Sequence, residues 1–110
     1  MSAAGRERIR SLLAAHPRVP LALLPTPLEH LPRLSAALGG PDIWVKRDDL
    51  TGLAFGGNKT RQLEYLLPGL VARTPDVLVT GANIQSNWSR QCAAAAARLG
   101  IPIEIGRAHV

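Results

Sequence analysis

Residues 76–105 read DVLVTGANIQSNWSRQCAAAAARLGIPIEI. The stretch opens with DVLVTG, a short continuous apolar run that is typical of a buried parallel strand. A polar loop, NIQSN, separates this run from residues 88–99, where five consecutive alanines favour a helix that packs closely on a sheet. Gly100 ends that helix, and IPIEI begins a second strand. The order strand, loop, helix, strand predicts a βαβ unit and therefore an α/β fold.

A second helix is expected immediately upstream of the βαβ unit. Leucines at positions 63, 66, 67 and 70 and a valine at 71 repeat at helical spacing after Lys59. Pro68 cannot donate a hydrogen bond to the carbonyl of Glu64, so we expect a kink or an early end there. Residues 43–47, IWVKR, alternate as a strand does.

The first forty residues predict two further helices joined by an extended segment. Residues 3–15 have the pattern of a short helix, and HPRVPLALLPTP is extended because prolines punctuate it. Thr26 and Pro27 combine an N-cap residue with proline at the first helical position. We therefore expect a helix from there, with leucines 28, 31, 34 and 38 as its apolar stripe and Gly39 and Gly40 at its end.

Composition excludes several classes of protein. The 110 residues are 46% apolar, which is enough for a core, and the net charge of +5 comes mostly from scattered arginines. There is no run of like charges with interleaved aromatics, so we expect no nucleic-acid partner. VPLALLPTPL is too short and too rich in proline to span a membrane. The single cysteine, Cys92, fits a reducing compartment, and we expect a cytoplasmic protein.

Two loops stand where α/β proteins bind ligands. Residues 52–61, GLAFGGNKTR, and residues 81–88, GANIQSNW, each lead into a predicted helix. Ligands of open α/β sheets bind beyond the carboxyl ends of strands, at helix N-termini. Together the two loops could hold a small anionic ligand.

The residues around Lys59 distinguish between possible functions of the first loop. A phosphate-binding P-loop requires glycine immediately before the lysine, but Asn58 stands there, so the nucleotide hypothesis is weak. A lysine near a helix N-terminus in a partly dry pocket is biased toward the neutral amine, which can form a Schiff base with a carbonyl. The alternative is an ordinary exposed lysine.

Two stretches together resemble one family. VKRDDLTGLAFGGNKTRQLEYLL and TGANIQSNWSRQCAAAAARLGIP are similar to D-cysteine desulfhydrase and 1-aminocyclopropane-1-carboxylate deaminase, and the resemblance runs over residues 25–104. These are pyridoxal 5'-phosphate enzymes of the tryptophan-synthase-β-like fold, also called fold type II. The resemblance implies an α/β fold with three α/β/α layers, of which this chain supplies an incomplete part.

The resemblance also implies roles for four residues. Lys59 carries the cofactor, and Asn87 hydrogen-bonds its phenolic oxygen. Ser86 contacts the substrate, with Gln85 and Asn87 beside it, while the loop amides receive the substrate carboxylate. Simple helix capping is the alternative for Ser86 and Asn87, and the two uses are compatible.

The implied function is a lyase or deaminase acting on a small amino acid. We expect D-cysteine to give a 2-oxo acid, ammonia and sulfide; the alternatives are ring opening of 1-aminocyclopropane-1-carboxylate, or a non-catalytic α/β fragment. The sequence departs from the family pattern at three positions. Trp88 stands where histidine is usual, which puts substrate choice in doubt, and Gln62 stands where a basic residue is usual. Pro68 interrupts the predicted helix after Lys59, which the family leaves intact. The family is commonly homodimeric, so we expect a homodimeric full-length parent, with no metal and no membrane partner.

Length shapes the expected domain organisation, because family members are much longer. Residues 1–73 would begin the large cofactor domain and residues 74–104 the small βαβ domain. The final IGRAHV, residues 105–110, does not resemble the family, and one encoding of it matches a sequencing-library adapter read in frame. We therefore expect an artefactual tail, and a chain that is inactive by itself because the glycine-rich phosphate loop lies elsewhere. His109 lies in this tail and carries no functional weight, and His16 and His30 have no partners at ligand spacing.

Overall fold

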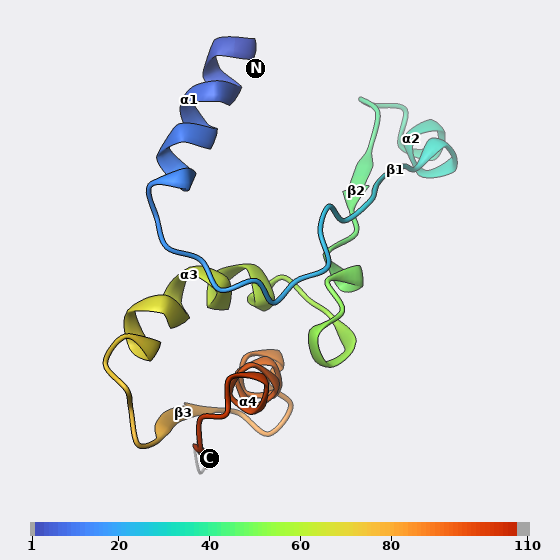
Figure 1. The fold of residues 1–110 in the computed structure, drawn as a ribbon. Coiled ribbons are helices and arrows are strands. Elements are labelled where there is room, and N and C mark those ends of the chain that lie inside the picture. Colours follow the sequence, from blue (N-terminus) through green and yellow to red (C-terminus); the bar gives the residue numbers. More distant parts are fainter. Residues whose placement is uncertain (1, 108–110) are drawn as a thin grey trace.

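The structure is a computed structural model that describes residues 2–107. The elements in chain order are α1 (Ala3–Ala14), β1 (Leu28–His30), α2 (Pro32–Leu38), β2 (Trp44–Lys46), the short 3-10 helices η1 (Asp48–Leu50) and η2 (Leu53–Phe55), α3 (Lys59–Val71), β3 (Leu78–Ala82), α4 (Asn87–Leu99) and β4 (Ile103–Arg107). Two arms, one formed by α1 and the other by β1, α2 and β2, project from a base of α3, α4 and β3 (Figure 1). The radius of gyration is accordingly 17.5 Å, against about 13 Å for a compact domain of this length.

The βαβ unit forms as predicted. β3 and β4 pair in parallel, with Leu78 opposite Ile103 and Ala82 opposite Arg107, and α4 connects them. Gly100 ends α4 with φ +69°. The expectation of a buried strand is wrong, because α4 packs on one face of the sheet and Val79 on the other face is 71% exposed.

The last six residues lie partly in this sheet. Residues 105–107 belong to β4 and pair with residues 80–82. Residues 108–110, with His109 among them, lie outside the described residues. The artefactual origin of residues 105–110 stays a prediction.

Helix α3 begins at Lys59 as predicted, but it does not end early at Pro68. It continues to Val71, and Leu63 and Leu67 on its inner side are buried. Because Pro68 has no N–H, the carbonyl of Glu64 is free within the helix. The backbone N–H of Val19 donates to that carbonyl at 2.9 Å. The proline therefore leaves an acceptor to which the extended segment before β1 binds.

The helix predicted to start at Thr26 and Pro27 is wrong in its first half. Residues 28–30 form β1, which pairs antiparallel with β2, and α2 starts only at Pro32. Thr26 caps no helix: its hydroxyl donates to Asp48 and accepts from Arg61. Long-range pairing and these polar partners override the local start signal, while Gly39 still ends α2 with φ +60°.

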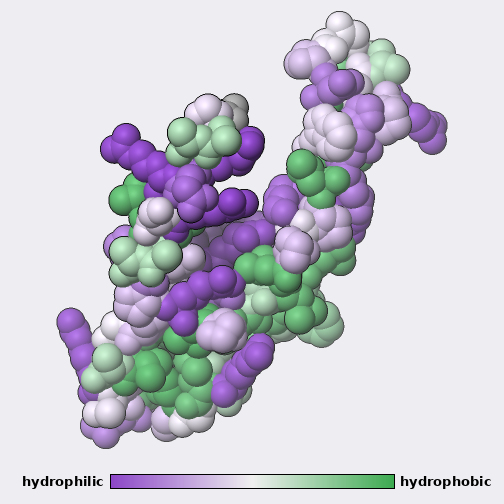
Figure 2. Space-filling view, turned by 45° about the horizontal axis from the view of Figure 1, so that its top comes forward, coloured by the Kyte–Doolittle hydropathy of each residue, from purple (hydrophilic) through white to green (hydrophobic). Residues whose placement is uncertain are grey.

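The apolar core is small and lies between α3, α4 and the extended segment. Its cluster of buried residues consists of Leu21, Leu63, Leu67, Cys92 and Ala95. α1 forms where it was expected but has no buried residue, and Figure 2 shows hydrophobic groups at the surface beside hydrophilic ones. None of the helices in the described part of the chain is long and apolar enough to cross a membrane.

Candidate functional site

The loop before α3, residues 51–59, is called the lysine loop here, and glycine shapes it. Gly56 has φ +75°, and a Cβ added there would lie 1.9 Å from the carbonyl oxygen of Asp49. Gly57 has φ +131°, and its added Cβ would lie 2.4 Å from Nε2 of Gln91. Ala54 and Phe55 also have positive φ, at +45° and +67°, a conformation that costs about 1–3 kcal/mol per residue and that clusters at functional sites. Only glycine fits the two positions before Asn58.

Buried threonine fixes the loop from inside. Thr51 is fully buried, and its hydroxyl accepts from the backbone N–H of Gly57 at 2.9 Å. The same hydroxyl lies 2.9 Å from the carbonyl oxygen of Gly57, to which it can donate. The two peptide groups that flank Gly57 are thus held by one side chain, two residues before Lys59.

Gln91 joins the lysine loop to α4. Its Nε2 donates to the carbonyl oxygen of Gly56 at 2.9 Å, and its Oε1 accepts from the hydroxyl of Thr60 at 2.6 Å. Gln91 and Thr60 are both fully buried. Gln91 is not among the residues predicted for the site; the available signal was a polar residue close to the alanine run of a helix that packs inward. Because of Gln91, the turn that carries Lys59 and the start of α4 lie in contact.

Lys59 is the first residue of α3, and its side chain is half-buried. Within residues 2–107, no hydrogen bond or ion pair of its amine is found, so Nζ is available to a ligand. An amine without an acidic partner, at the positive end of a helix, fits a covalent use better than a salt bridge.

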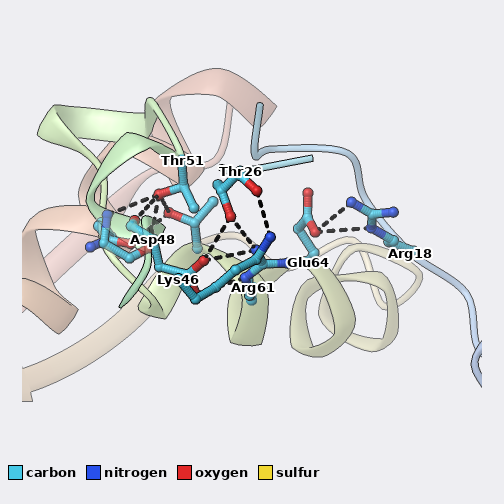
Figure 3. Close-up of polar contacts among 10 residues, drawn as sticks. Arg18, Thr26, Lys46, Asp48, Thr51, Arg61 and Glu64 are labelled. Carbon is cyan, nitrogen blue, oxygen red and sulfur yellow. Dashed lines mark hydrogen bonds and ion pairs between the residues drawn. The ribbon is translucent and has the colours of Figure 1, made fainter. Parts of the chain in front are cut away.

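A polar cluster behind the loop supports this helix start (Figure 3). Arg61 donates to both carboxylate oxygens of Asp48 at 2.8 Å, and Thr26 donates to Asp48 at 3.1 Å. Hydrogen bonding from Arg61, with a smaller contribution from Thr26, lowers the pKa of Asp48 below its ordinary value of 3.8. Lys46 donates to the backbone carbonyl of Thr26. The first turn of α3 is therefore fastened to β2 and η1 through charged groups.

A second buried carboxylate fastens α3 to the extended segment. Glu64 is 1% exposed, and its Oε1 accepts from the backbone N–H groups of Leu21 and Ala22, both at 2.8 Å. Its Oε2 pairs with Arg18 at 2.7 Å (Figure 3). Together with the carbonyl of the same residue, these bonds hold the extended segment along α3.

The loop before α4, residues 83–87, is called the serine loop here, and it is more open. Ser86 is the N-cap of α4, and its hydroxyl oxygen accepts from the backbone N–H of Ser89 at 3.2 Å. Gln85 and Asn87 are exposed, and Oδ1 of Asn87 accepts from Nη2 of Arg90 at 3.2 Å. Capping by Ser86 is confirmed, and within residues 2–107 no acceptor of its hydroxyl hydrogen is found, so the hydroxyl can still donate.

A pocket with a volume of about 350 Å³ lies at this loop, at the carboxyl end of β3. Its lining residues are Ala82, Asn83, Ile84, Ser86, Ser89, Arg90 and Ile105. No acidic side chain lines it, and two buried donors, Ser89 Oγ and Arg90 Nη1, have no partner in the part of the chain that is described. This donor set fits a ligand rich in acceptors, such as a carboxylate or a phosphorylated cofactor with a phenolic oxygen. Of the four residues predicted for the site, Ser86 lines the pocket, whereas Lys59, Gln85 and Asn87 lie outside its lining.

Trp88 and His30 have partners away from the pocket. Nε1 of Trp88 donates to the hydroxyl of Thr80 at 3.0 Å, so this side chain ties α4 to β3. His30 lies 3.2 Å from Asp42 and stacks on Trp44 in the arm. Groups of three or more His, Cys, Asp or Glu side chains that could hold a metal ion are not found within residues 2–107.

Comparison with known proteins assigns the family. The family model described as "Pyridoxal-phosphate dependent enzyme" matches residues 19–107. The chain belongs to this family. Pyridoxal phosphate is the family's cofactor, as the resemblance implied, and residues 19–107 include both loops.

The chain is also similar to individual proteins of known name. The chain is 55% identical over 93 residues to a 1-aminocyclopropane-1-carboxylate deaminase of Rhizobium leguminosarum bv. viciae; the match covers 83% of this chain and 27% of the relative. It is 56% identical over 91 residues to a protein of the same name from Ralstonia nicotianae, covering 81% and 27%. The crystal structure of an ACC deaminase homologue matches with a TM-score of 0.84 and 41% identity, covering 96% of this chain and 31% of that one. The chain thus spans less than a third of these relatives, and the expected fold type II is confirmed.

Proposed function

We propose that the protein acts as a pyridoxal-phosphate-dependent deaminase that opens the ring of 1-aminocyclopropane-1-carboxylate and, with one water molecule, gives a 2-oxo acid and ammonia. The observation that carries the proposal is the available amine of Lys59, which follows a turn fixed by two glycines. The names of the relatives support the substrate.

Lys59 has two tasks in this proposal. Its Nζ would hold the cofactor covalently, and after the substrate amine has replaced it Nζ would move a proton at a ring methylene carbon, because the carbon that bears the amine has no hydrogen. The cofactor, when bound, supplies an electron sink for charge that develops on the carbon that bears the amine. The fixed lysine loop keeps Nζ in one position, which proton transfer requires.

The serine loop would bind and orient the two ligands. The free hydroxyl hydrogen of Ser86 and the uncapped N–H groups of the first turn of α4 would receive the substrate carboxylate, which the helix dipole favours. Asn87 would donate to the phenolic oxygen of the cofactor. Gln85 is exposed beside them and would contact substrate.

D-cysteine desulfhydrase activity is the alternative, since it needs the same lysine and the same carboxylate site. The two reactions differ in the bond that breaks, a carbon–sulfur bond or a ring carbon–carbon bond. A scaffold that retains the fold without turnover is the remaining alternative.

The first test uses the protein expressed from its complete reading frame. Borohydride reduction in the presence of pyridoxal phosphate, followed by peptide mass spectrometry, should place one pyridoxyl phosphate on Lys59. Lys59→Arg should remove it, and the matched variant Lys46→Arg should keep it. Unmodified Lys59 in a folded protein contradicts the proposal.

A second test concerns the substrate. We expect 2-oxo acid from 1-aminocyclopropane-1-carboxylate and no sulfide from D-cysteine. Release of sulfide in a Lys59-dependent way would favour the desulfhydrase alternative. Absence of both products from a correctly loaded protein would favour the non-catalytic one.

Asn87 gives a third test. A hydrogen bond to a polarised oxygen contributes about 1.5–3 kcal/mol, so Asn87→Ala should weaken cofactor binding by roughly ten-fold or more. Equilibrium titration monitored by absorbance measures this. Unchanged affinity in a folded variant would argue against the role of Asn87.

A further inference from the structure

Arg90 occupies a position that helix electrostatics disfavour. It lies in the first turn of α4, where the helix dipole repels cations, and it is half-buried. No ion pair of its guanidinium is found among the described residues. A half-buried cation without a counter-charge at a helix N-terminus needs a compensating contact.

Its Nη2 makes two contacts that span the candidate site. It donates to the carbonyl oxygen of Gly56 in the lysine loop at 3.3 Å and to Oδ1 of Asn87 in the serine loop at 3.2 Å. The guanidinium carbon also lies 6.0 Å from the ring centre of Phe55, within the range of a cation–π contact. One side chain therefore touches the loop of the cofactor lysine and the asparagine of the opposite loop.

The contact with Arg90 decides which end of the Asn87 amide faces outward. A guanidinium has donors only, so it can face Oδ1 and not Nδ2. With Oδ1 held, the NH₂ end of this exposed amide remains to donate to a ligand. Without Arg90 nothing in the described contacts would orient the side chain of Asn87.

We propose that Arg90 is a positioning residue: it orients the Asn87 amide so that Nδ2 faces the cofactor, and it fixes that amide relative to the lysine loop through Gly56. The inference rests on the proposed function in one respect, the identity of the ligand. Arg90 itself need not touch the ligand to act in this way.

The first experiment does not depend on the cofactor. In the protein from the complete reading frame, side-chain amide resonances of Asn87 are assigned with Asn87→Asp and their order parameters are measured by NMR relaxation. Arg90→Ala should markedly lower the order parameter of the Nδ2 group, while Arg33→Ala, a change in the exposed part of α2, should leave it unchanged. An unchanged order parameter in Arg90→Ala would overturn the proposal, whether or not cofactor binds.

The second experiment uses a double-mutant cycle on cofactor binding and on the absorption band of the bound cofactor. Arg90→Ala should weaken cofactor binding about ten-fold and shift the band in the same direction as Asn87→Ala. The double variant should bind no more weakly than Asn87→Ala alone, because both changes remove the same contact. Effects that multiply, or a band that moves only in Asn87→Ala, overturn the positioning role.

The controls separate this inference from the proposed function. Arg90→Lys, which keeps the charge but lacks the planar fork, should not restore the band. If borohydride finds no cofactor on Lys59, the proposed function fails, and the NMR result still decides the role of Arg90.

Discussion

The lysine loop and the serine loop both lead into a helix, but they are built in opposite ways. The lysine loop carries positive φ at five positions and is held by fully buried side chains, Thr51, Thr60 and Gln91. The serine loop is exposed at residues 83–85 and is held mainly by the single cap of Ser86. Strain and buried polar bonds therefore concentrate on one side of the site, and free donors concentrate on the other.

The difference matches the two kinds of binding proposed. A covalent anchor that also moves a proton must stay in one place, so a rigid turn suits Lys59. A carboxylate is bound by donors that are exposed before it arrives, and the first turn of α4 provides them. The variants of Gly56 and Gln91 below should alter the lysine loop, and the variant of Ser86 should alter the serine loop.

Gly56→Ala should have the largest effect. Its Cβ would meet the backbone oxygen of Asp49 at 1.9 Å, and the φ of +75° adds strain of about 1–3 kcal/mol. We expect loss of the lysine-loop structure, seen as a clear fall in the denaturant midpoint. Gly69→Ala is the matched control in α3, where nothing lies within 4 Å, and it should stabilise the helix by about 0.5–1 kcal/mol. Equal effects of the two variants would contradict the rigidity assigned to the loop.

Gln91→Leu should have the next largest effect. It removes the acceptor of the buried Thr60 hydroxyl and leaves the carbonyl oxygen of Gly56 with Arg90 Nη2 alone. A buried group that loses its partner costs about 1–3 kcal/mol. Hydrogen exchange should accelerate at Gly57 and Thr60 more than at Ser89. Gln62→Leu changes an exposed glutamine near the start of α3 and serves as the control. Uniform acceleration in both loops would show that Gln91 does not act on the lysine loop in particular.

The pair of Asp48 and Arg61 should make stability depend on pH in the acid range. Arg61 lowers the pKa of Asp48 in the folded state below 3.8, so the unfolded chain binds the proton more readily. The stabilisation is complete above the unfolded pKa and is lost as the pH falls through the folded pKa. Urea unfolding of the wild type and of Asp48→Asn should therefore differ most at neutral pH and converge toward acid pH. A difference that does not shrink with acid would contradict this origin.

Ser86→Ala should have the smallest effect, about 1 kcal/mol for the loss of an N-cap. It should lower the global unfolding free energy, because α4 packs on the core through Cys92 and Ala95. Ser2→Ala removes a similar cap from α1, a helix with no buried residue, and should leave global unfolding unchanged. Identical losses in the two variants would show that the contrast between the helices is wrong.

Sequence alone determined the features that depend on neighbours along the chain. The βαβ order, the start of α3 at Lys59, the glycine ends of α2 and α4 and the cap at Ser86 all follow from periodicity, turn chemistry and capping over a few residues. The family resemblance, the cofactor and the fold type were also available from two short motifs.

Tertiary structure decided what depends on distant partners. Thr26 accepts a hydrogen bond from Arg61, 35 positions away, and does not cap a helix. Pro68 stayed inside α3 because Val19 takes the carbonyl it frees. Gln91 and Arg90 both donate to the carbonyl oxygen of Gly56, which lies 35 and 34 positions away along the chain. A polar side chain can form hydrogen bonds with groups of its own segment, and these can be expected from the sequence. Tertiary packing excludes water and brings distant polar groups close, so it decides which partner a buried side chain finally has.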